Sequence, residues 1–294
     1  MEARLRAAAF GTDLAVPDAV LADAAAAGPL PRWLAAVVLG GRGDYARAAA
    51  LLEPLLGCRD RVFASLAAST LASHRRQLGG HANARVLDAA ALRAVAGADR
   101  GTGTADVAPD PDGIDVAGAR ADALLGLAAD ALALGRQREA RTLLARVADA
   151  EPAVESCWRT RVRHAWVSAE VELAAGDAAA ARPYAERAAA VAREHGGSRH
   201  VLKSDLVLAA ALGVAGATPD ALARQVRDHT RKLGLYPLTW PAALLLADAT
   251  GTDDAAAASE LRQEASSIVH ALLRRADPLG RNLASASPWV PNVD

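Results

Sequence analysis

The chain has 294 residues and a formal net charge of −1, and 52% of its residues are hydrophobic although only 3% are aromatic. A core built mainly of alanine, leucine and valine favours close helix packing over a β-sandwich, and the length permits one long domain or two ordinary ones. The nearly neutral charge provides no overall field toward nucleic acid or an anionic membrane, so we expect neither as a partner.

The N-terminal region, residues 1–28, is expected to hold short capping helices over residues 2–10 and 18–27. Pro17 and Asp18 are typical of the start of the second helix. The first residues lack the apolar stretch that a secretion signal requires.

The longest apolar run, Leu206 to Ala217, is too short to span a bilayer and is interpreted as a buried helix. Cys58 and Cys157 are isolated in the sequence and are expected to be free thiols. Together these features predict a cytoplasmic location.

Six glycines each separate two alanine-rich stretches. The residue five places after each glycine is alanine, and the residue seven places before it is alanine in five cases and Leu244 in the sixth. Glycine readily adopts the left-handed conformation that ends a helix, and small residues on both sides allow two helices to approach closely. The pattern therefore predicts stacked helical hairpins. The glycines are Gly43, Gly79, Gly135, Gly176, Gly216 and Gly251.

The glycines divide the chain into about six hairpins. Residues 29–95 would form hairpins one and two, and residues 117–275 hairpins three to six. Residues 96–116 are rich in Gly, Asp, Thr and Pro, which predicts a flexible loop or linker, either within one solenoid or between two subdomains. Residues 276–294 are expected to be a C-terminal tail, in which Trp289 either caps the apolar face of the last hairpin or contacts another chain.

The turn and packing positions of three hairpins resemble the tetratricopeptide repeat (TPR). The fifth and sixth hairpins depart from the pattern, because Gln225 and Glu260 occupy apolar positions, so their register is expected to shift by one or two residues. The resemblance implies an all-α solenoid with a binding role rather than a named activity. The residues that carry it are Gly43-Asp44-Tyr45 with Ala48, Leu52 and Leu55; Gly135 with Ala140, Leu144 and Val147; and Gly176-Asp177 with Ala181, Ala185 and Ala188.

No motif for catalysis, a metal or a cofactor is recognised, so we do not expect an enzyme. The segment Asp110-Pro-Asp112-Gly113 suggests a calcium loop, but Ala108 and Ala119 stand where an EF-hand needs acidic ligands. The seven histidines show no zinc-binding spacing.

The candidate binding site lies on the first helices of hairpins four and five. Helical spacing places Arg159, Arg163, Trp166 and Glu170 on one face of the fourth hairpin's first helix. Lys203 occupies the same position in hairpin five as Arg163 in hairpin four, because each precedes its turn glycine by thirteen residues.

Arg163 and Lys203 would then be neighbouring cations that clamp carboxylates of a partner, with Trp166 as an apolar anchor. His200 is expected near Lys203. The alternative is that the arginines form an ordinary solvated face and that Trp166 belongs to the core.

The sequence therefore predicts a scaffold or adaptor that binds a segment of a protein or peptide partner, with an acidic or C-terminal carboxylate motif, in the concave groove of the solenoid. The alternative function is a regulatory sensor whose repeats bind a short peptide or a small molecule. A catalytic protein with a site that no motif reveals is a third interpretation. The N-terminal region is too short for a DNA-binding helix-turn-helix domain.

Overall fold

The computed structural model describes residues 1–97, 109–149, 157–216, 219–251 and 254–291, and every regular element in these ranges is a helix. Each of the six turn glycines lies between the two helices of a hairpin and has a positive φ, between 56° and 79°. The fold is therefore the TPR-like all-α solenoid that the glycine pattern predicted.

The first helices of the hairpins are α3 (Pro29–Gly41), α5 (Arg61–Gln77), α7 (Val116–Ala133), α10 (Trp158–Ala174), α12 (Ser198–Val214) and α14 (Tyr236–Thr250). The second helices are α4 (Tyr45–Leu52) with the short η1 (Glu53–Leu55), α6 (His81–Ala94), α8 (Gln137–Ala148), α11 (Ala178–His195), α13 (Asp220–Lys232) and α15 (Ala255–Arg274). Three further helices flank them: α1 (Glu2–Phe10), α2 (Asp18–Ala24) and α16 (Pro278–Ser285).

The alanines around the turns are packing positions. Those seven places before the first five glycines are all fully buried, as are those five places after the first four. In the last two hairpins the alanines five places after the glycine, Ala221 and Ala256, are exposed, and Ala223 and Ala258 are buried instead. The register therefore shifts by two residues at the second helix, as the polar residues there predicted.

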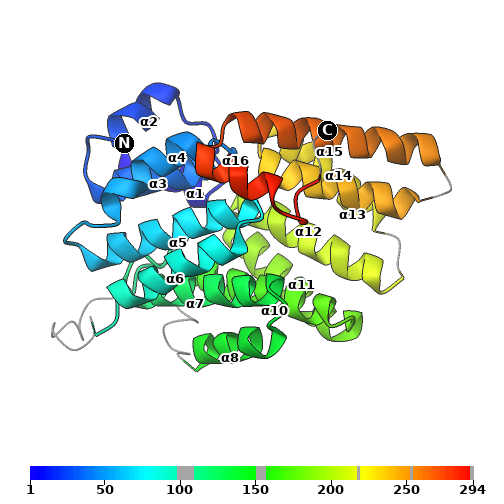
Figure 1. Ribbon diagram of the computed structural model, residues 1–294, viewed down its shortest axis with the longest axis horizontal. Helices are drawn as coiled ribbons and strands as arrows, with labels where there is room; N and C mark the ends of the chain where they lie inside the picture. The colour runs from blue at the N-terminus through cyan, green and yellow to red at the C-terminus, as the bar shows by residue number, and fades with distance from the viewer. Residues whose placement is uncertain (98–108, 150–156, 217–218, 252–253, 292–294) are drawn as a thin grey trace.

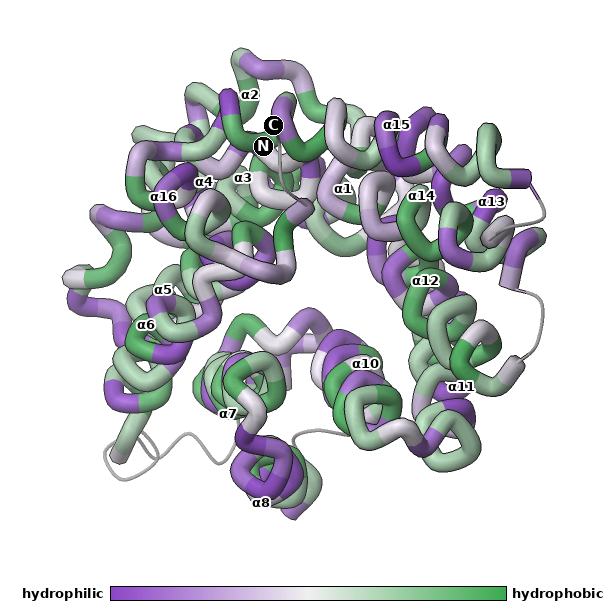
Figure 2. Tube along the Cα trace, turned by 45° about the vertical axis from the view of Figure 1, so that its right-hand side comes forward, coloured by the Kyte–Doolittle hydropathy of each residue, from purple (hydrophilic) through white to green (hydrophobic). Residues whose placement is uncertain are grey.

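The hairpins follow one another in a ring (Figure 2), with α7, α10 and α12 along the inside and α8 and α11 farther out. The N-terminal helix α1 is part of this arrangement, because it packs on both α3 and α12. Ser198 N, at the start of α12, donates a hydrogen bond to Gly11 O at 3.1 Å. The N-terminal region thus contacts the fifth hairpin as well as the first.

The C-terminal hairpin closes the ring against the N-terminal hairpins. Figure 1 shows α15 and α16 beside α4 and α5, at the opposite end of the sequence. Arg75 of α5 pairs with Asp277 at 2.6 Å, and Ala46 N donates to Arg275 O at 2.8 Å. A buried apolar cluster, formed by Tyr45 and Leu78 with Val269, Leu272, Ala276, Ala284 and Val290, fills this seam.

The C-terminal segment differs from the expected tail, because residues Pro278–Ser285 form the helix α16. It docks at the turn of hairpin two rather than capping hairpin six. Gly79 and Gly80 have no side chains at this turn, and a Cβ on Gly79 would overlap Ser287. Trp289 is 59% exposed and lies edge-on to His81, with ring centroids 6.4 Å apart, so the expectation that it caps the last hairpin was wrong.

Most of the loop expected over residues 96–116 lies outside the described residues. Its described end, residues 109–115, is tied down: Asp110 Oδ1 accepts hydrogen bonds from Asp112 N and Ile114 N at 2.8 and 3.3 Å. Arg6 of α1 pairs with Asp110 at 3.2 Å and with Asp112 at 2.7 Å. Among the described helices, none combines the length and apolar character needed to cross a bilayer.

Candidate functional site

A cavity of about 390 Å³ lies at the centre of the ring, and every residue that lines it comes from the first helix of a hairpin. The lining positions recur at fixed distances before the turn glycines. Trp33 precedes Gly43 by ten residues, and Trp166 precedes Gly176 by the same number. The residue ten places before the glycine lines the cavity in all six hairpins: Trp33, Ser69, Leu125, Trp166, Leu206 and Pro241.

Positions one turn away from this one also face the cavity. The residue thirteen places before the glycine lines it in hairpins three to six, as Asp122, Arg163, Lys203 and Leu238. Steps of three and four residues keep side chains on one face of a helix, so a single stripe of each first helix faces inward. All six candidate residues from the sequence lie on this lining: Arg159, Arg163, Trp166, Glu170, His200 and Lys203.

The two arginines of α10 are already paired with an acid. Arg159 Nη2 lies 2.8 Å from Asp122 Oδ2, and Arg163 pairs with the other carboxylate oxygen of Asp122. Burial would raise the pKa of Asp122, but these two guanidinium groups hold it below its usual value. Arg159, one of the binding residues expected from the sequence, is only 5% exposed and pairs with an acid of the chain.

Lys203 is also paired. Its Nζ lies 2.9 Å from Glu170 Oε1 and 5.8 Å from the centre of the Trp166 ring. Trp166 donates from its indole nitrogen to Ser204 Oγ at 2.8 Å and packs against the core while also lining the cavity. The two neighbouring cations expected from the sequence, Arg163 and Lys203, both line the cavity, and each forms an ion pair with an acid on the neighbouring first helix.

His200 is buried between aromatic rings. It stacks on Trp166, with centroids 5.6 Å apart, and meets Trp158 edge-on at 4.7 Å. Burial, helped by Arg199, lowers the pKa of His200 well below its usual value, so the imidazole is neutral. His200 therefore shapes the cavity wall and adds no positive charge to it.

The loop end at residues 109–115 holds two side chains at the start of α10 in place. Arg159 Nε donates to Asp112 O at 2.7 Å, and Trp158 Nε1 donates to Asp112 Oδ1 at 3.0 Å. In the sequence this segment suggested a calcium loop that lacks two of the acidic ligands an EF-hand needs. Within the described part of the chain, no group of His, Cys, Asp and Glu side chains is arranged to hold a metal ion.

Arg199 is the residue that reasoning from the sequence missed. It lines the cavity from the first turn of α12. Arg199 precedes Gly216 by seventeen residues, as Arg159 precedes Gly176, so the repeat register contained the signal. Burial, together with Arg159 and Arg163, lowers the pKa of Arg199 to about 10, which leaves it charged at neutral pH.

The cavity has three chemically distinct walls. Helices α10 and α12 supply most of the charged groups, joined by Asp122 of α7 and Arg76 of α5, and α5 also supplies neutral hydroxyl and amide groups from Thr70, Ser73 and Gln77. Helix α14 supplies an apolar surface from Pro237, Leu238 and Pro241. Such a combination can bind a ligand that has an anionic group, hydrogen-bonding amides and an apolar part.

No protein family model and no curated protein matches this chain. Among solved structures, the chain is similar to a Rap protein complexed with Competence and Sporulation Factor. The two are 14% identical, the similarity covers 91% of this chain and 76% of that one, and the TM-score is 0.59. This likeness concerns the fold.

Two structures of TPR-like repeats from a putative kinesin light chain of Podosopora anserina are each 20% identical to this chain. They cover 74% and 78% of it, and 93% and 98% of their own chains, with TM-scores of 0.40 and 0.41. By its helical hairpins and its central cavity, the chain is a TPR-like helical repeat protein.

Proposed function

We propose that this protein is a non-catalytic binding protein that holds a short segment of a protein or peptide partner in its central cavity. The observation that carries this proposal is the cavity itself, to which all six first helices contribute. Its volume of about 390 Å³ falls within the range of about 300–1,000 Å³ that is typical of ligand sites.

The composition of the walls supports a peptide ligand. Hydroxyl and amide side chains on α5 match the donors and acceptors of a peptide backbone, and the leucine and prolines of α14 match an apolar side chain. The volume of the cavity suits a segment of a few residues. A long partner helix laid in a groove, as a solenoid scaffold would bind it, fits a cavity of this size between six first helices less well.

The similar Rap protein also supports a binding role, because that protein is complexed with Competence and Sporulation Factor. From this similarity we transfer to the present chain only the general role of a helical repeat that binds a partner. The acidic or carboxylate motif expected in the partner remains part of the proposal.

Peptide retention by a cavity-filled variant tests the proposal. Ser73 lines the cavity and belongs to no ion pair among the described residues, so Ser73→Trp fills the space without removing a charge. Ser267→Trp, on the exposed face of α15, adds the same side chain elsewhere. Each protein is immobilised and incubated with random octapeptides, and retained peptides are identified by mass spectrometry.

We expect the wild-type protein and Ser267→Trp to retain the same peptides and Ser73→Trp to retain at least about tenfold less. Equal retention by all three folded proteins would place binding outside the cavity. Absence of any retained peptide would contradict the proposed ligand class.

A regulatory sensor is the second candidate, and the seam favours it. Helices α5 and α14 both line the cavity, and α5 also meets α16 through Arg75 and Asp277. A ligand that contacts both sides of the seam would stabilise the closed ring. The sensor differs from a plain scaffold in one measurable respect: the bound peptide should slow hydrogen exchange in α16, which does not line the cavity.

A further inference from the structure

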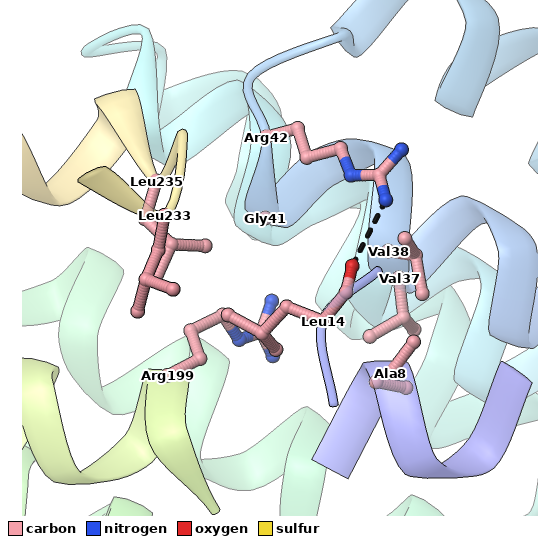
Figure 3. A pocket seen from close by; sticks show the side chains of 10 residues that line it. Ala8, Leu14, Val37, Val38, Gly41, Arg42, Arg199, Leu233 and Leu235 are labelled. Carbon is pink, nitrogen blue, oxygen red and sulfur yellow. Dashed lines mark hydrogen bonds between the residues drawn. The ribbon is translucent and has the colours of Figure 1, made fainter. Parts of the chain in front are cut away.

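Arg199 lies between two cavities. One is the central cavity, and the other is a small space of about 10 Å³, enough for a single water molecule at most. Figure 3 shows the side chain of Arg199 reaching from α12 toward Leu14 and the helix α3. Gly41 makes room for it, because a Cβ there would lie 3.2 Å from Arg199 Nη1.

Among the described residues, none on the wall of the small cavity accepts a hydrogen bond from this guanidinium. Its wall is formed mainly by apolar side chains, among them Val37 and Leu235. The carbonyl oxygens of Leu14 and Val16 accept hydrogen bonds from Arg42 Nη2 at 3.0 and 3.3 Å. Figure 3 accordingly draws a hydrogen bond from Arg42 and none from Arg199.

The central cavity provides no carboxylate for Arg199 either. Asp122 is shared by Arg159 and Arg163, and Glu170 is bound by Lys203. A fourth lining arginine, Arg76, has two acids behind the wall, Asp88 at 2.5 Å and Asp130 at 2.8 Å. Within the described residues, Arg199 is thus the cation of the lining that has no acidic partner.

A charge in this position is unfavourable unless an anion joins it. Burial and the two neighbouring arginines act together to lower the pKa of Arg199, whereas the pKa of Arg159 is raised by its acid. His74 and His200 also line the cavity, and burial lowers the pKa of both, so neither carries charge near neutral pH. Among the described lining residues, the Arg199 guanidinium therefore remains a charge without an ion pair.

We propose, on the basis of the proposed peptide-binding function, that Arg199 is the specificity-determining residue of the site and binds a carboxylate of the ligand. A planar guanidinium matches a carboxylate through two parallel hydrogen bonds, and Arg199 forms no ion pair among the described residues that a ligand carboxylate would have to displace. Arg159, Arg163 and Lys203, which form ion pairs with acids of the chain, shape the wall around it.

The carboxylate has two sources in a peptide, the C-terminus and an Asp or Glu side chain. Three octapeptide libraries distinguish them: one without Asp and Glu and with a free C-terminus, the same library with a C-terminal amide, and an amidated library that contains Asp and Glu. Each is offered to the wild-type protein, to Arg199→Met and to Arg224→Met. Arg224 is exposed on α13, so its replacement changes the net charge equally without touching the cavity.

We expect the wild-type protein and Arg224→Met to retain peptides that carry a carboxylate, and Arg199→Met to bind the same peptides about 10- to 100-fold more weakly. Because Arg199 has no acidic partner, Arg199→Met is also expected to unfold at the same temperature as the wild type or higher. A preference for the free C-terminus or for the acidic side chains would identify the source.

Two results would overturn the role of Arg199 and leave the proposed function intact: unchanged binding by Arg199→Met, or equally tight binding of the amidated library without acids. Failure of the wild-type protein to retain any library would overturn both proposals. Circular dichroism of each variant verifies that the compared proteins are folded.

Discussion

At the scale of single residues, the stability of the cavity wall rests on Asp122. This carboxylate is buried and pairs with two arginines of α10 at once. Breaking a buried ion pair by removing one partner is strongly unfavourable, because the remaining charge stays in a poorly solvated place.

Replacing Asp122 by Asn should therefore destabilise the protein by about 3–5 kcal/mol. Asp248→Asn is the matched control, because its carboxylate pairs with Arg262 at 3.2 Å on the surface and should contribute less than about 1 kcal/mol. Urea unfolding of both variants measures the difference. A loss at Asp122 no larger than that at Asp248 would mean that the wall does not depend on this pair.

His74 supplies a dependence of stability on pH. Burial, together with the charges of Arg199 and Arg75, lowers the pKa of His74 to about 3. Its ordinary value in an unfolded chain is about 6.5, so below that pH the unfolded state binds the proton and the folded state does not. The stabilising effect is therefore fully present above about pH 6.5 and is lost as the pH falls toward 3.

We expect the wild-type free energy of unfolding to fall by about 2–3 kcal/mol more between pH 7 and 4.5 than that of His74→Gln. Other titrating groups are common to both proteins and cancel in the comparison. Chemical unfolding at the two pH values gives the result, and parallel curves for the two proteins would exclude a neutral buried His74.

At the scale of the elements, the turn glycines ensure that each hairpin folds back on itself. Gly135 has a φ of 74°, and no atom lies within 4 Å of the place where a Cβ would stand, so only its backbone conformation resists a side chain. Gly57 also has open space around it, but its φ is not positive. The two glycines thus separate the effect of conformation from that of packing.

Gly135→Ala should destabilise the protein by about 1–2 kcal/mol, because a left-handed conformation is unfavourable for alanine. Gly57→Ala should be neutral or slightly stabilising, since it only restricts the unfolded chain. Thermal unfolding compares them. Equal effects would show that the turn does not require glycine.

The same elements show what the sequence could predict. The small residues around Gly43 and Gly176 indicated the hairpins because close packing needs them locally, within one unit. The cavity lining recurs at fixed places before each glycine. Arg199, which was missed, could therefore have been identified from the same register that identified Lys203. The pairing of Arg163 with Asp122 was missed because it joins two hairpins, whose relative position no local pattern specifies.

At the scale of the whole molecule, the sequence did not predict that the solenoid closes into a ring. The closure joins segments about two hundred residues apart through Gly79, Gly80 and the apolar seam, and the sequence indicated only an open solenoid. Asp277 is central to this contact: it pairs with Arg75 and accepts a hydrogen bond from Gly280 N at 2.8 Å, at the start of α16.

Asp277→Ala should loosen α16 and raise its hydrogen-exchange rate about 5- to 100-fold, because both the helix cap and the partner of buried Arg75 are lost. Asp254→Ala is a suitable control, since Asp254 caps α15 through Ala257 N at 2.9 Å and has no ion pair among the described residues. Exchange in α8, on the far side of the ring, should stay unchanged. An equal response of α16 to both variants would mean that Asp277 does not hold the ring closed.

The central claim is that the partner segment lies inside the ring. Photo-crosslinking from single positions tests it most directly, with benzoylphenylalanine at Gln77, which lines the cavity, or at Ser267 on the outer face of α15. We predict that a retained peptide crosslinks to the protein labelled at position 77 and not to the protein labelled at position 267. Equal crosslinking at both positions, or crosslinking at position 267 alone, would contradict binding in the cavity.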